Sequence, residues 1–363
     1  MNFFSVRTYN FRNLENTQIN INAKNIFLIG ENGQGKTNFL EAIYVLCFGN
    51  SFRTKIDSLL VKEEEKEMAV NGVYYDVEKK EDGVQNSIQF SIVKGKKTIV
   101  LNEKKIKDRK EIIYNIPCVV FSHDDIFFVN GSPDRRRTFF NQTISLFDCN
   151  YLDNLRKYEK VLKNRNAVLK NNDREIISVL DMQLAEKGIE LIKTREKITE
   201  EFNEIFSSVF SKVSDFDSKI KILYKPSWGA ETDIEKIKKI LSSKIDAETA
   251  LGTTLSGPHR DRFYYYMNKK DFTKIASTGQ TRLISLALKT AQAEFYREKT
   301  GKKPLILLDD ALLELDKVKK IRFIEALPEY EQAFFAFLPG EEKIVSEKKG
   351  VFYTVDKGSI RER

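Results

Sequence analysis

One glycine-rich segment most constrains what this chain of 363 residues can fold into: Gly30-Glu31-Asn32-Gly33-Gln34-Gly35-Lys36-Thr37. It fits the pattern G-x-x-x-x-G-K-[ST] and lies between an apolar run, 26–29, and a helical pattern that begins at Lys36. Its glycines let the backbone turn tightly, so that N–H groups point at phosphate oxygens near the positive end of a helix. An ordinary glycine-rich turn is the alternative. The segment predicts a strand–loop–helix site for ATP or GTP.

Within this loop, Lys36 is predicted to reach the β- and γ-phosphates and Thr37 to ligate Mg²⁺. A phosphate-bound Mg²⁺ also needs a carboxylate at the end of a neighbouring buried strand. The run 305–308 is wholly apolar, as in a central parallel strand, and Asp309 and Asp310 follow it. We expect Asp309 at the metal and Asp310 to orient or deprotonate the attacking water. Two acids that follow an apolar strand incidentally are the alternative.

A third segment, Ser277-Thr278-Gly279-Gln280, stands just before a predicted long helix and ahead of Asp309 in the chain. By itself it is typical of a helix N-cap. Its order relative to the two sites above resembles the signature motif of ATP-binding-cassette ATPases, whose serine contacts the γ-phosphate held by the opposite subunit. That resemblance implies that Ser277, Gly279 and Gln280 complete the nucleotide site in trans.

The chain alternates between strand-rich and helix-rich parts. Strands are predicted at 3–9, 18–21, 26–29, 68–77, 87–93 and 98–101, and a helical hairpin between about 133 and 210. Helices at 280–299 and 317–327, a strand at 304–308 and strands near 334 and 352 follow. The fold class is therefore α/β, with one domain made from both chain ends around an inserted, mainly helical arm domain. The expected divisions are 1–120, 121–250 and 251–363.

The charge balance favours an acidic polymer as partner, because 61 Lys and Arg against 53 Asp and Glu leave a net charge of +8. A solvated charged surface is the alternative. Candidate DNA contacts that would neutralise phosphates without reading bases are Lys104, Lys105, Lys107, Arg109, Lys110, Arg135, Arg136 and Arg137. The three arginines have a second interpretation, internal pairing with Asp124, Asp125 or Asp134. We identify no stacking platform of the kind used for single strands.

Several classes of protein do not fit the composition. No apolar run approaches the ~20 residues of a membrane span, and the N-terminus lacks a secretory signal, so we expect a cytoplasmic protein. The three cysteines form no C-x-x-C pair, and only two histidines are present, so neither a disulfide frame nor a zinc site is expected.

Taken together, the motifs resemble the RecF family, bacterial recombination and gap-repair ATPases of the SMC-like group. The resemblance runs from residue 3 to about 338. Besides the serine motif and the acidic strand, it rests on residues 10–14, 37–43, 131–137, 151–158, 163–166 and 257–261.

This resemblance implies an ABC/SMC-like ATPase head that forms an ATP-driven homodimer clamp on DNA, both at single-strand gaps and on duplex. It implies a weak, DNA-stimulated ATPase with ATP and Mg²⁺ as cofactors. RecR and RecO are the implied partners, which help to load RecA at gaps and support replication-fork maintenance and the SOS response. Arg12 and Asn13 would sit near the nucleotide, or form only a turn between strands.

Some positions depart from the family pattern. Leu313 stands where the D-loop usually has a serine, and His123 stands where proline is expected. No switch histidine or threonine occurs in 332–337, and no Q-loop glutamine is evident near 121–125, so slow hydrolysis is expected. His259 is expected to be a hydrogen-bonded structural residue.

Two other functions are alternatives to this one. The first is an ATP-binding scaffold without significant turnover, which the missing switch residue permits. The second is the nucleotide-binding subunit of another ABC-type system such as a membrane transporter, which predicts a Q-loop and a switch histidine.

Overall fold

The computed structural model describes residues 2–75, 85–171, 173–214, 219–345 and 348–363. The chain divides into two compact units, the first made of Met1–Asp124 with Gln292–Arg363 and the second of Asp125–Ala291. Both chain ends thus contribute to one unit, and the middle of the chain forms the other. The inserted unit ends at Ala291, whereas the sequence suggested that the inserted domain ends at residue 250.

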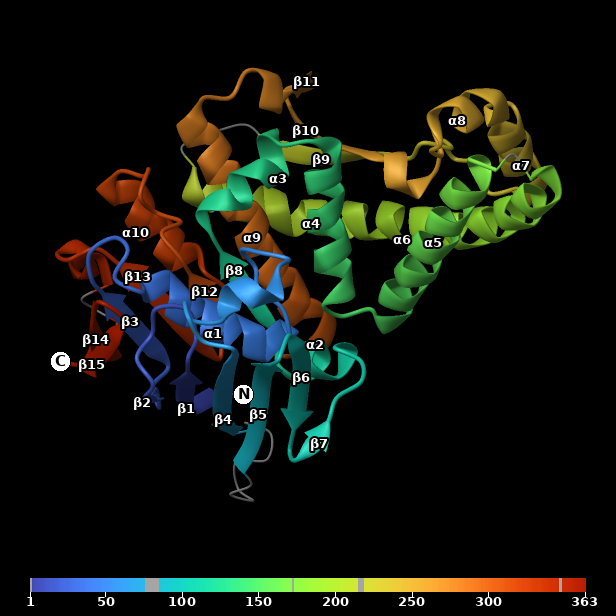
Figure 1. Cartoon of the computed structure of the whole chain (residues 1–363). Coiled ribbons are helices and arrows are strands. Elements are labelled where there is room, and N and C mark those ends of the chain that lie inside the picture. Colours follow the sequence, from blue (N-terminus) through green and yellow to red (C-terminus); the bar gives the residue numbers. More distant parts are fainter. Residues whose placement is uncertain (1, 76–84, 172, 215–218, 346–347) are drawn as a thin grey trace. The chain divides into compact units, whose positions relative to one another are not determined.

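The first unit holds a six-stranded, mainly parallel sheet in the order β15-β14-β3-β13-β12-β8. Strands from the start and the end of the chain therefore lie side by side, as the blue and red strands of Figure 1 show. All residues of β3, β13, β12 and β8 are buried, as expected for parallel strands covered on both faces. The predicted strands are confirmed, and β8 and β15 are additional. The bounds are β3 Asn25–Ile29, β8 Cys118–Phe121, β12 Leu305–Leu308, β13 Gln332–Phe337, β14 Val351–Asp356 and β15 Ser359–Glu362.

A second, antiparallel sheet of the first unit has the order β2-β1-β4-β5-β6-β7. Buried and part-exposed residues alternate along β4, as in a strand with one face on a core. The predicted strand 68–77 ends at Tyr75 as far as the structure describes it, since 76 and 77 lie outside the described residues. The bounds are β1 Asn2–Tyr9, β2 Gln18–Asn20, β4 Glu67–Tyr75, β5 Gln85–Val93, β6 Lys96–Leu101 and β7 Lys104–Lys105.

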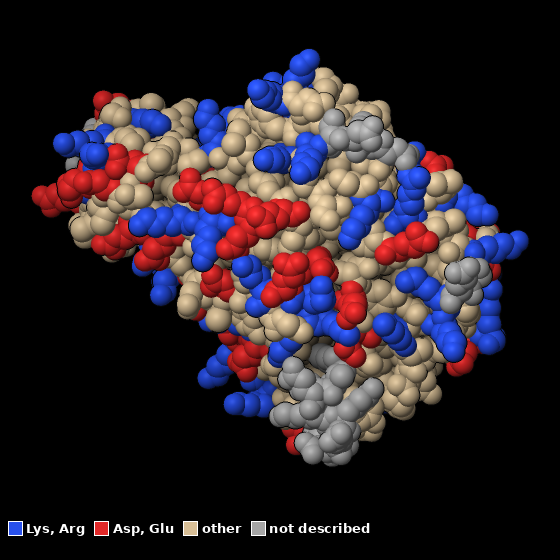
Figure 2. Space-filling view, turned by 180° about the vertical axis from the view of Figure 1, so that it is seen from behind, with Lys and Arg blue, Asp and Glu red and all other residues tan. Residues whose placement is uncertain are grey.

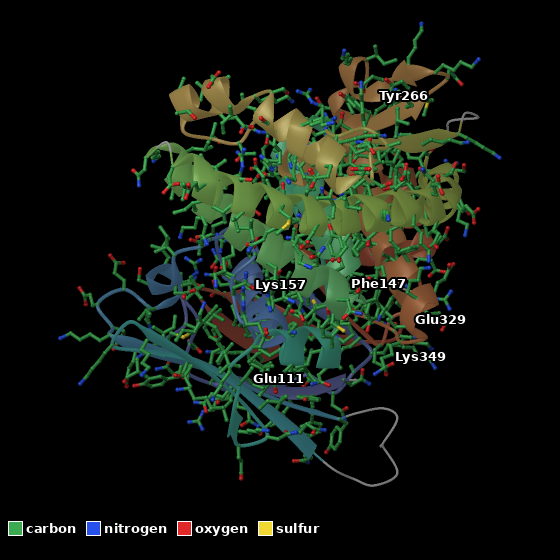
Figure 3. All side chains as sticks on the ribbon, turned by 90° about the vertical axis from the view of Figure 1, so that its right-hand side faces the viewer. Glu111, Phe147, Lys157, Tyr266, Glu329 and Lys349 are labelled. Carbon is green, nitrogen blue, oxygen red and sulfur yellow. The ribbon has the colours of Figure 1, made fainter. Side chains whose placement is uncertain are left out.

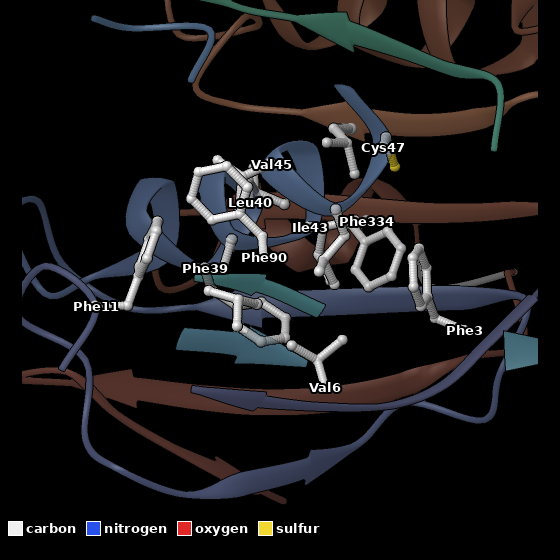
Figure 4. Close-up of a cluster of buried hydrophobic side chains, with 14 of the residues drawn as sticks. Phe3, Val6, Phe11, Phe39, Leu40, Ile43, Val45, Cys47, Phe90 and Phe334 are labelled. Carbon is white, nitrogen blue, oxygen red and sulfur yellow. The ribbon is translucent and has the colours of Figure 1, made fainter. Parts of the chain in front are cut away.

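Helix α1, Lys36–Phe48, lies between these two sheets and contacts both β4 and β5 of one and β12 and β13 of the other. It is buried almost all round because Phe39, Leu40, Ile43 and Val45 point to different sides. Figure 4 shows α1 side chains packed with Phe3 of β1 and Phe334 of β13. The helix that follows the glycine-rich loop is therefore fixed by the main core of the unit. The first unit also contains the short helix α2, Lys110–Asn115, and helix α10, Lys317–Ala326.

The second unit contains the predicted helical hairpin, formed by α5 (Cys149–Leu169) and α6 (Arg174–Val213). Asp148 and Asp173 cap these helices by accepting a hydrogen bond from the backbone N–H of the third residue of each helix. At 40 residues, α6 extends about 60 Å at 1.5 Å per residue. The other helices are α3 Phe127–Asn130, α4 Pro133–Ser145, α7 Ile234–Ser242, α8 Ile245–Leu251 and α9 Thr278–Thr300, the last of which continues into the first unit.

A three-stranded antiparallel sheet, β11-β10-β9, was not predicted. Its strands are β9 Ile220–Lys225, β10 Arg262–Met267 and β11 Lys270–Asp271. Because β10 pairs with β9 along its whole length, residues after 251 pack with the second unit, which explains the later division. Among the residues that the structure describes, no helix is long and apolar enough to cross a membrane.

Candidate nucleotide-binding site

The glycine-rich loop connects β3 to α1 and approaches β14 closely. A side chain at Gly30 would place its Cβ 2.3 Å from the Val355 carbonyl oxygen. Gly35, the N-cap of α1, has φ 119°, a conformation that residues with side chains rarely adopt. The two fixed glycines of the motif are thus required by this backbone, which ends at the positive end of a 13-residue helix.

The Lys36 side chain lies over the loop itself. Its ammonium donates hydrogen bonds to the carbonyl oxygens of Gly30 at 2.6 Å and Glu31 at 2.9 Å, and the residue is 4% exposed. Burial lowers the pKa of Lys36, and the carboxylates of Asp310 and Asp309 oppose this. The predicted phosphate-binding lysine is therefore held beside both predicted acids.

Thr37 and Asp309 meet directly, although 272 positions separate them in the chain. The Thr37 hydroxyl donates to Asp309 Oδ1 at 2.7 Å. Asp309 follows β12, and its N–H donates to the Phe121 carbonyl oxygen at the end of β8. Burial raises the pKa of Asp309 to about 6, against the hydrogen bond from Thr37. A hydroxyl and a carboxylate oxygen at this spacing are ligands that suit Mg²⁺, which would neutralise phosphate charge there.

Asp310 stands next to this pair in a strained conformation, with φ 48°. Its Oδ1 is buried and has no hydrogen-bond partner within the described chain. Burial raises the pKa of this carboxyl, Lys36 opposes the rise, and Glu341 and His123 act on it in opposite directions. An unpartnered carboxylate oxygen beside these two candidate metal ligands suits a group that binds water or a hydrated ion. His123 and Glu341 lie near the site, which the sequence did not indicate.

Ser277 caps α9 through a reciprocal pair of hydrogen bonds. The Gln280 N–H donates to Ser277 Oγ at 3.3 Å, and the Ser277 N–H donates to Gln280 Oε1 at 2.8 Å. Ser277 and Gly279 are exposed, and nothing lies within 4 Å of a Cβ built at Gly279. The N-cap interpretation is thus correct for the isolated chain, and the helix start remains open to another molecule.

Comparisons with known proteins agree with this geometry. A family model described as the RecF/RecN/SMC N terminal domain matches residues 4–356. The DNA replication and repair protein RecF of Treponema pallidum (strain Nichols) is 39% identical over 356 residues, covering 97% of this chain and 99% of that protein. The chain belongs to the RecF family. The RecF protein of Leptospira interrogans serovar Lai is 32% identical, covering 90% of this chain and 88% of its own.

Solved structures give the same family. The recombination mediator protein RecF-ATP of the RecFOR pathway matches with a TM-score of 0.88 at 31% identity, covering 99% of this chain and 97% of that one. An Smc head bound to the C-winged helix domain of ScpA matches with a TM-score of 0.57 at 16% identity over 99% of this chain and 97% of that one. The latter likeness shows the fold alone, an SMC-like head, which confirms the predicted fold class.

Arg12 and Asn13, which the RecF-family resemblance placed near the nucleotide, lie in a turn beside α1. Arg12 has φ 51° and donates two hydrogen bonds of 2.9 Å to the fully buried Glu41 carboxylate. The Asn13 side chain accepts from Asn38 at 2.6 Å and stands 3.3 Å from a Cβ built at Gly35. The turn that was the alternative is therefore present, and Asn13 lies beside the loop, whereas the placement of both residues near a nucleotide stays a prediction.

The sequence did not indicate that Arg53 and the turn between β14 and β15 lie at this site. Arg53 donates to Asn38 Oδ1 at 2.8 Å, and its charge helps to keep Asp309 ionised. The turn between β14 and β15 holds the loop, because the N–H groups of Lys357 and Gly358 donate to Gln34 at 2.7 and 2.8 Å. Neither carries a local sequence signal, since these contacts join distant parts of the chain.

The predicted DNA contacts differ in how free their side chains are. Arg136 donates to the Phe263 carbonyl oxygen at 3.0 Å, and Arg137 donates to the Asp261 carbonyl oxygen at 2.9 Å and to Asp134 at 3.3 Å. These two therefore serve the second unit internally, although the expected pairing was with acids alone. Arg135 is exposed, as are Lys104, Lys105 and Lys107. On the face drawn in Figure 2, basic and acidic side chains are interspersed.

The segment 257–261 holds a buried network. His259 Nε2 lies 3.0 Å from the Thr254 carbonyl oxygen, so this nitrogen carries the proton, and Nδ1 accepts from the Tyr158 hydroxyl at 2.7 Å. Burial lowers the pKa of His259 to about 4, which keeps it neutral at pH 7. These contacts fit the expected structural histidine.

Proposed function

We propose that this protein is an ATP-dependent DNA-binding protein of recombinational gap repair and replication-fork maintenance. The observation that carries the proposal is the 2.7 Å contact between Thr37 and Asp309, which joins the phosphate loop to the acidic strand in a RecF-family chain. The relatives that cover nearly the whole chain are named DNA replication and repair proteins.

In the proposed reaction each side chain has a separate task. The Lys36 ammonium attracts the β- and γ-phosphates, and Thr37 and Asp309 offer oxygen ligands to Mg²⁺. The unpartnered Oδ1 of Asp310 accepts a hydrogen bond from the attacking water. Hydrolysis is slow, because β13 is followed by Leu338 and Pro339, which offer no side-chain hydrogen bond to a γ-phosphate. We extend the proposal to stimulation of this hydrolysis by DNA.

A second copy of the chain completes the site in this proposal. The exposed start of α9, with Ser277, Gly279 and Gln280, supplies hydrogen-bond donors to the γ-phosphate bound by the other copy. Two DNA-binding surfaces on one dimer then act together through their effective concentration. We extend the proposal to RecO and RecR as partners, to RecA loading at single-strand gaps and to a role in the SOS response. Arg135, Lys104, Lys105 and Lys107 are the proposed phosphate contacts.

The proposed dimer predicts a result by analytical ultracentrifugation. With Mg²⁺ and a hydrolysis-resistant ATP analogue, wild type is expected to sediment as a dimer, and without nucleotide as a monomer. Ser277→Arg is expected to remain a monomer, because the long side chain occupies the surface that meets the other copy, yet to bind the analogue as tightly as wild type. Ser211→Arg, at an exposed serine of α6, is the matched control and should dimerise. A Ser277→Arg variant that dimerises like wild type would contradict the role in trans.

A scaffold that holds ATP without turnover is the remaining alternative. Phosphate release measured with and without DNA separates the two functions, since only the ATPase releases phosphate above the level of an Asp310→Asn variant. The match of the RecF/RecN/SMC model over residues 4–356 favours DNA repair over the nucleotide-binding subunit of a membrane transporter.

A further inference from the structure

One face of the three-stranded sheet in the second unit carries only cations, tyrosines and one leucine on its two long strands. Burial alternates along β9 and β10, so that one set of side chains packs inward and the other points to solvent. We call the solvent-facing set the outer sheet face; its members are Lys221, Leu223, Lys225, Arg262, Tyr264 and Tyr266.

The strand register brings these six residues into three neighbouring pairs. Arg262 lies opposite Lys225, Tyr264 opposite Leu223, and Tyr266 opposite Lys221. The rings of Tyr264 and Tyr266 are neighbours along β10, with centroids 6.2 Å apart and an interplanar angle of 76°. Figure 3 labels Tyr266 on this strand. Two aromatic rings therefore stand in a row on β10, with Arg262 before Tyr264 on the same strand and Lys221 beside Tyr266 on β9.

The inner face of the same strands fixes this arrangement. Phe263 stacks on Phe140 of α4 with ring centroids 3.9 Å apart. The Tyr265 hydroxyl donates to the Phe128 carbonyl oxygen at 2.9 Å. The outer sheet face is thus presented by strands that the core of the second unit holds in place, which limits the entropy lost when a ligand binds.

The charges of the outer sheet face have no acidic partner among the residues that the structure describes. In the described part of the chain, Lys221, Lys225 and Arg262 form no ion pair within 4.0 Å, and Leu223 is 49% exposed. The nearest acid in the register is Asp271, opposite Tyr266, and its carboxylate already accepts two hydrogen bonds from Thr273. Three cations without an ion-pair partner among the described residues thus surround the exposed Leu223 and the half-buried rings of Tyr264 and Tyr266, and together they form a positive, partly apolar platform.

This combination matches the chemistry of single-stranded nucleic acid. Unpaired bases stack on aromatic side chains, and the adjacent phosphates bind Lys and Arg, whereas the bases of a duplex are already stacked on one another. We propose that the outer sheet face binds single-stranded DNA, with bases on Tyr264 and Tyr266 and phosphates at the three cations. This proposal deepens the DNA binding proposed above and rests on it.

The test measures fluorescence anisotropy of a labelled oligo-dT strand and of a blunt duplex, with Mg-ATP, over a salt series. The double variant Tyr264→Ala/Tyr266→Ala is expected to bind oligo-dT at least about tenfold more weakly than wild type, because it removes two base–aromatic stacks. Its affinity for the duplex should change less than about twofold. The triple variant of Lys221, Lys225 and Arg262 to Gln should reduce the salt slope for oligo-dT by about 2.

Control variants keep the outcome interpretable. Tyr264→Phe/Tyr266→Phe keeps the rings and should bind oligo-dT within about twofold of wild type, and Tyr9→Ala removes a 43% exposed tyrosine of the first unit. All variants should bind ATP as wild type does, which shows that they fold. Equal loss of duplex and single-strand binding, or oligo-dT binding by the alanine pair at wild-type strength, would overturn the proposal while leaving ATP-dependent DNA binding intact. Wild type that binds no DNA would overturn both.

Discussion

Asp309→Asn is expected to lower the rate of ATP hydrolysis at least about 100-fold, because it removes a charged magnesium ligand that contributes several kcal/mol to phosphoryl transfer. The amide oxygen can still accept the 2.7 Å hydrogen bond from Thr37, so the local structure should persist. Phosphate release at saturating Mg-ATP measures this loss. Asp310→Asn, the neighbouring matched variant, should lose turnover but retain Mg-ATP affinity, because Asp310 is placed as the water-binding group.

Asp309→Asn should also stabilise the folded protein without nucleotide at pH 7. Burial raises the pKa of Asp309 from 3.8 to about 6, so the folded state binds more protons than the unfolded state between these values. The ionised carboxylate therefore costs stability above pH 6, and this cost declines as the pH falls from about 6 to 3.8, below which both states are protonated. Asp309→Asn removes a cost of up to about 3 kcal/mol at pH 7, so its Tm without nucleotide should exceed that of wild type.

The pH dependence of nucleotide binding follows the opposite sign. Protonated Asp309 cannot ligate Mg²⁺, so Mg-ATP affinity of wild type should fall as the pH drops through about 6. If Asp309→Asn hydrolysed ATP at the wild-type rate, or had a Tm clearly below that of wild type at pH 7, Asp309 would not be a buried metal ligand.

Asp261→Ala is expected to reduce the unfolding free energy of the second unit by about 3–5 kcal/mol, because it leaves Arg195 as an unpaired buried charge. Asp261 is 0% and Arg195 2% exposed, and Arg195 Nη1 lies 2.9 Å from Asp261 Oδ2. Asp261 also accepts from the Tyr224 hydroxyl and, at 2.7 Å, from the Ser227 N–H. Urea denaturation followed by fluorescence of the single tryptophan, Trp228, which is buried beside this network, measures the loss.

The control for Asp261 is an exposed ion pair of the same unit. Glu235→Ala breaks the i,i+3 pair between Glu235 and Lys238, which should cost no more than about 0.5 kcal/mol. The double variant Arg195→Met/Asp261→Leu should recover much of the stability, since it removes both buried charges. Equal denaturation midpoints for Asp261→Ala and Glu235→Ala would show that the buried pair contributes nothing.

The sequence predicted the parts of the nucleotide site that follow from local chemistry. The glycine-rich motif predicted a strand–loop–helix junction, and the structure places Gly30, Lys36 and Thr37 there. Asp309 follows a wholly apolar strand, as predicted. The 2.7 Å contact between Thr37 and Asp309 follows from one further rule, that parallel strands end at the same edge of a sheet.

Other features depended on contacts that local patterns do not encode. Strands β9 and β10 are short and far apart in the chain, and only their pairing reveals the outer sheet face. Arg136 and Arg137 resembled a DNA-binding run, but carbonyl oxygens 127 and 124 positions away accept their hydrogen bonds. The Lys357–Gly358 turn shows no motif, although it holds Gln34 of the phosphate loop.

ATP bound in the phosphate loop is proposed to control the affinity of the protein for DNA. DNA affinity is measured with and without Mg-ATP, for wild type and Lys36→Met, across a salt series. Wild type is expected to gain affinity with ATP, Lys36→Met is not, and binding should fall steeply with salt. Wild type that binds ATP but shows the same DNA affinity with and without it would show that the nucleotide does not control DNA binding.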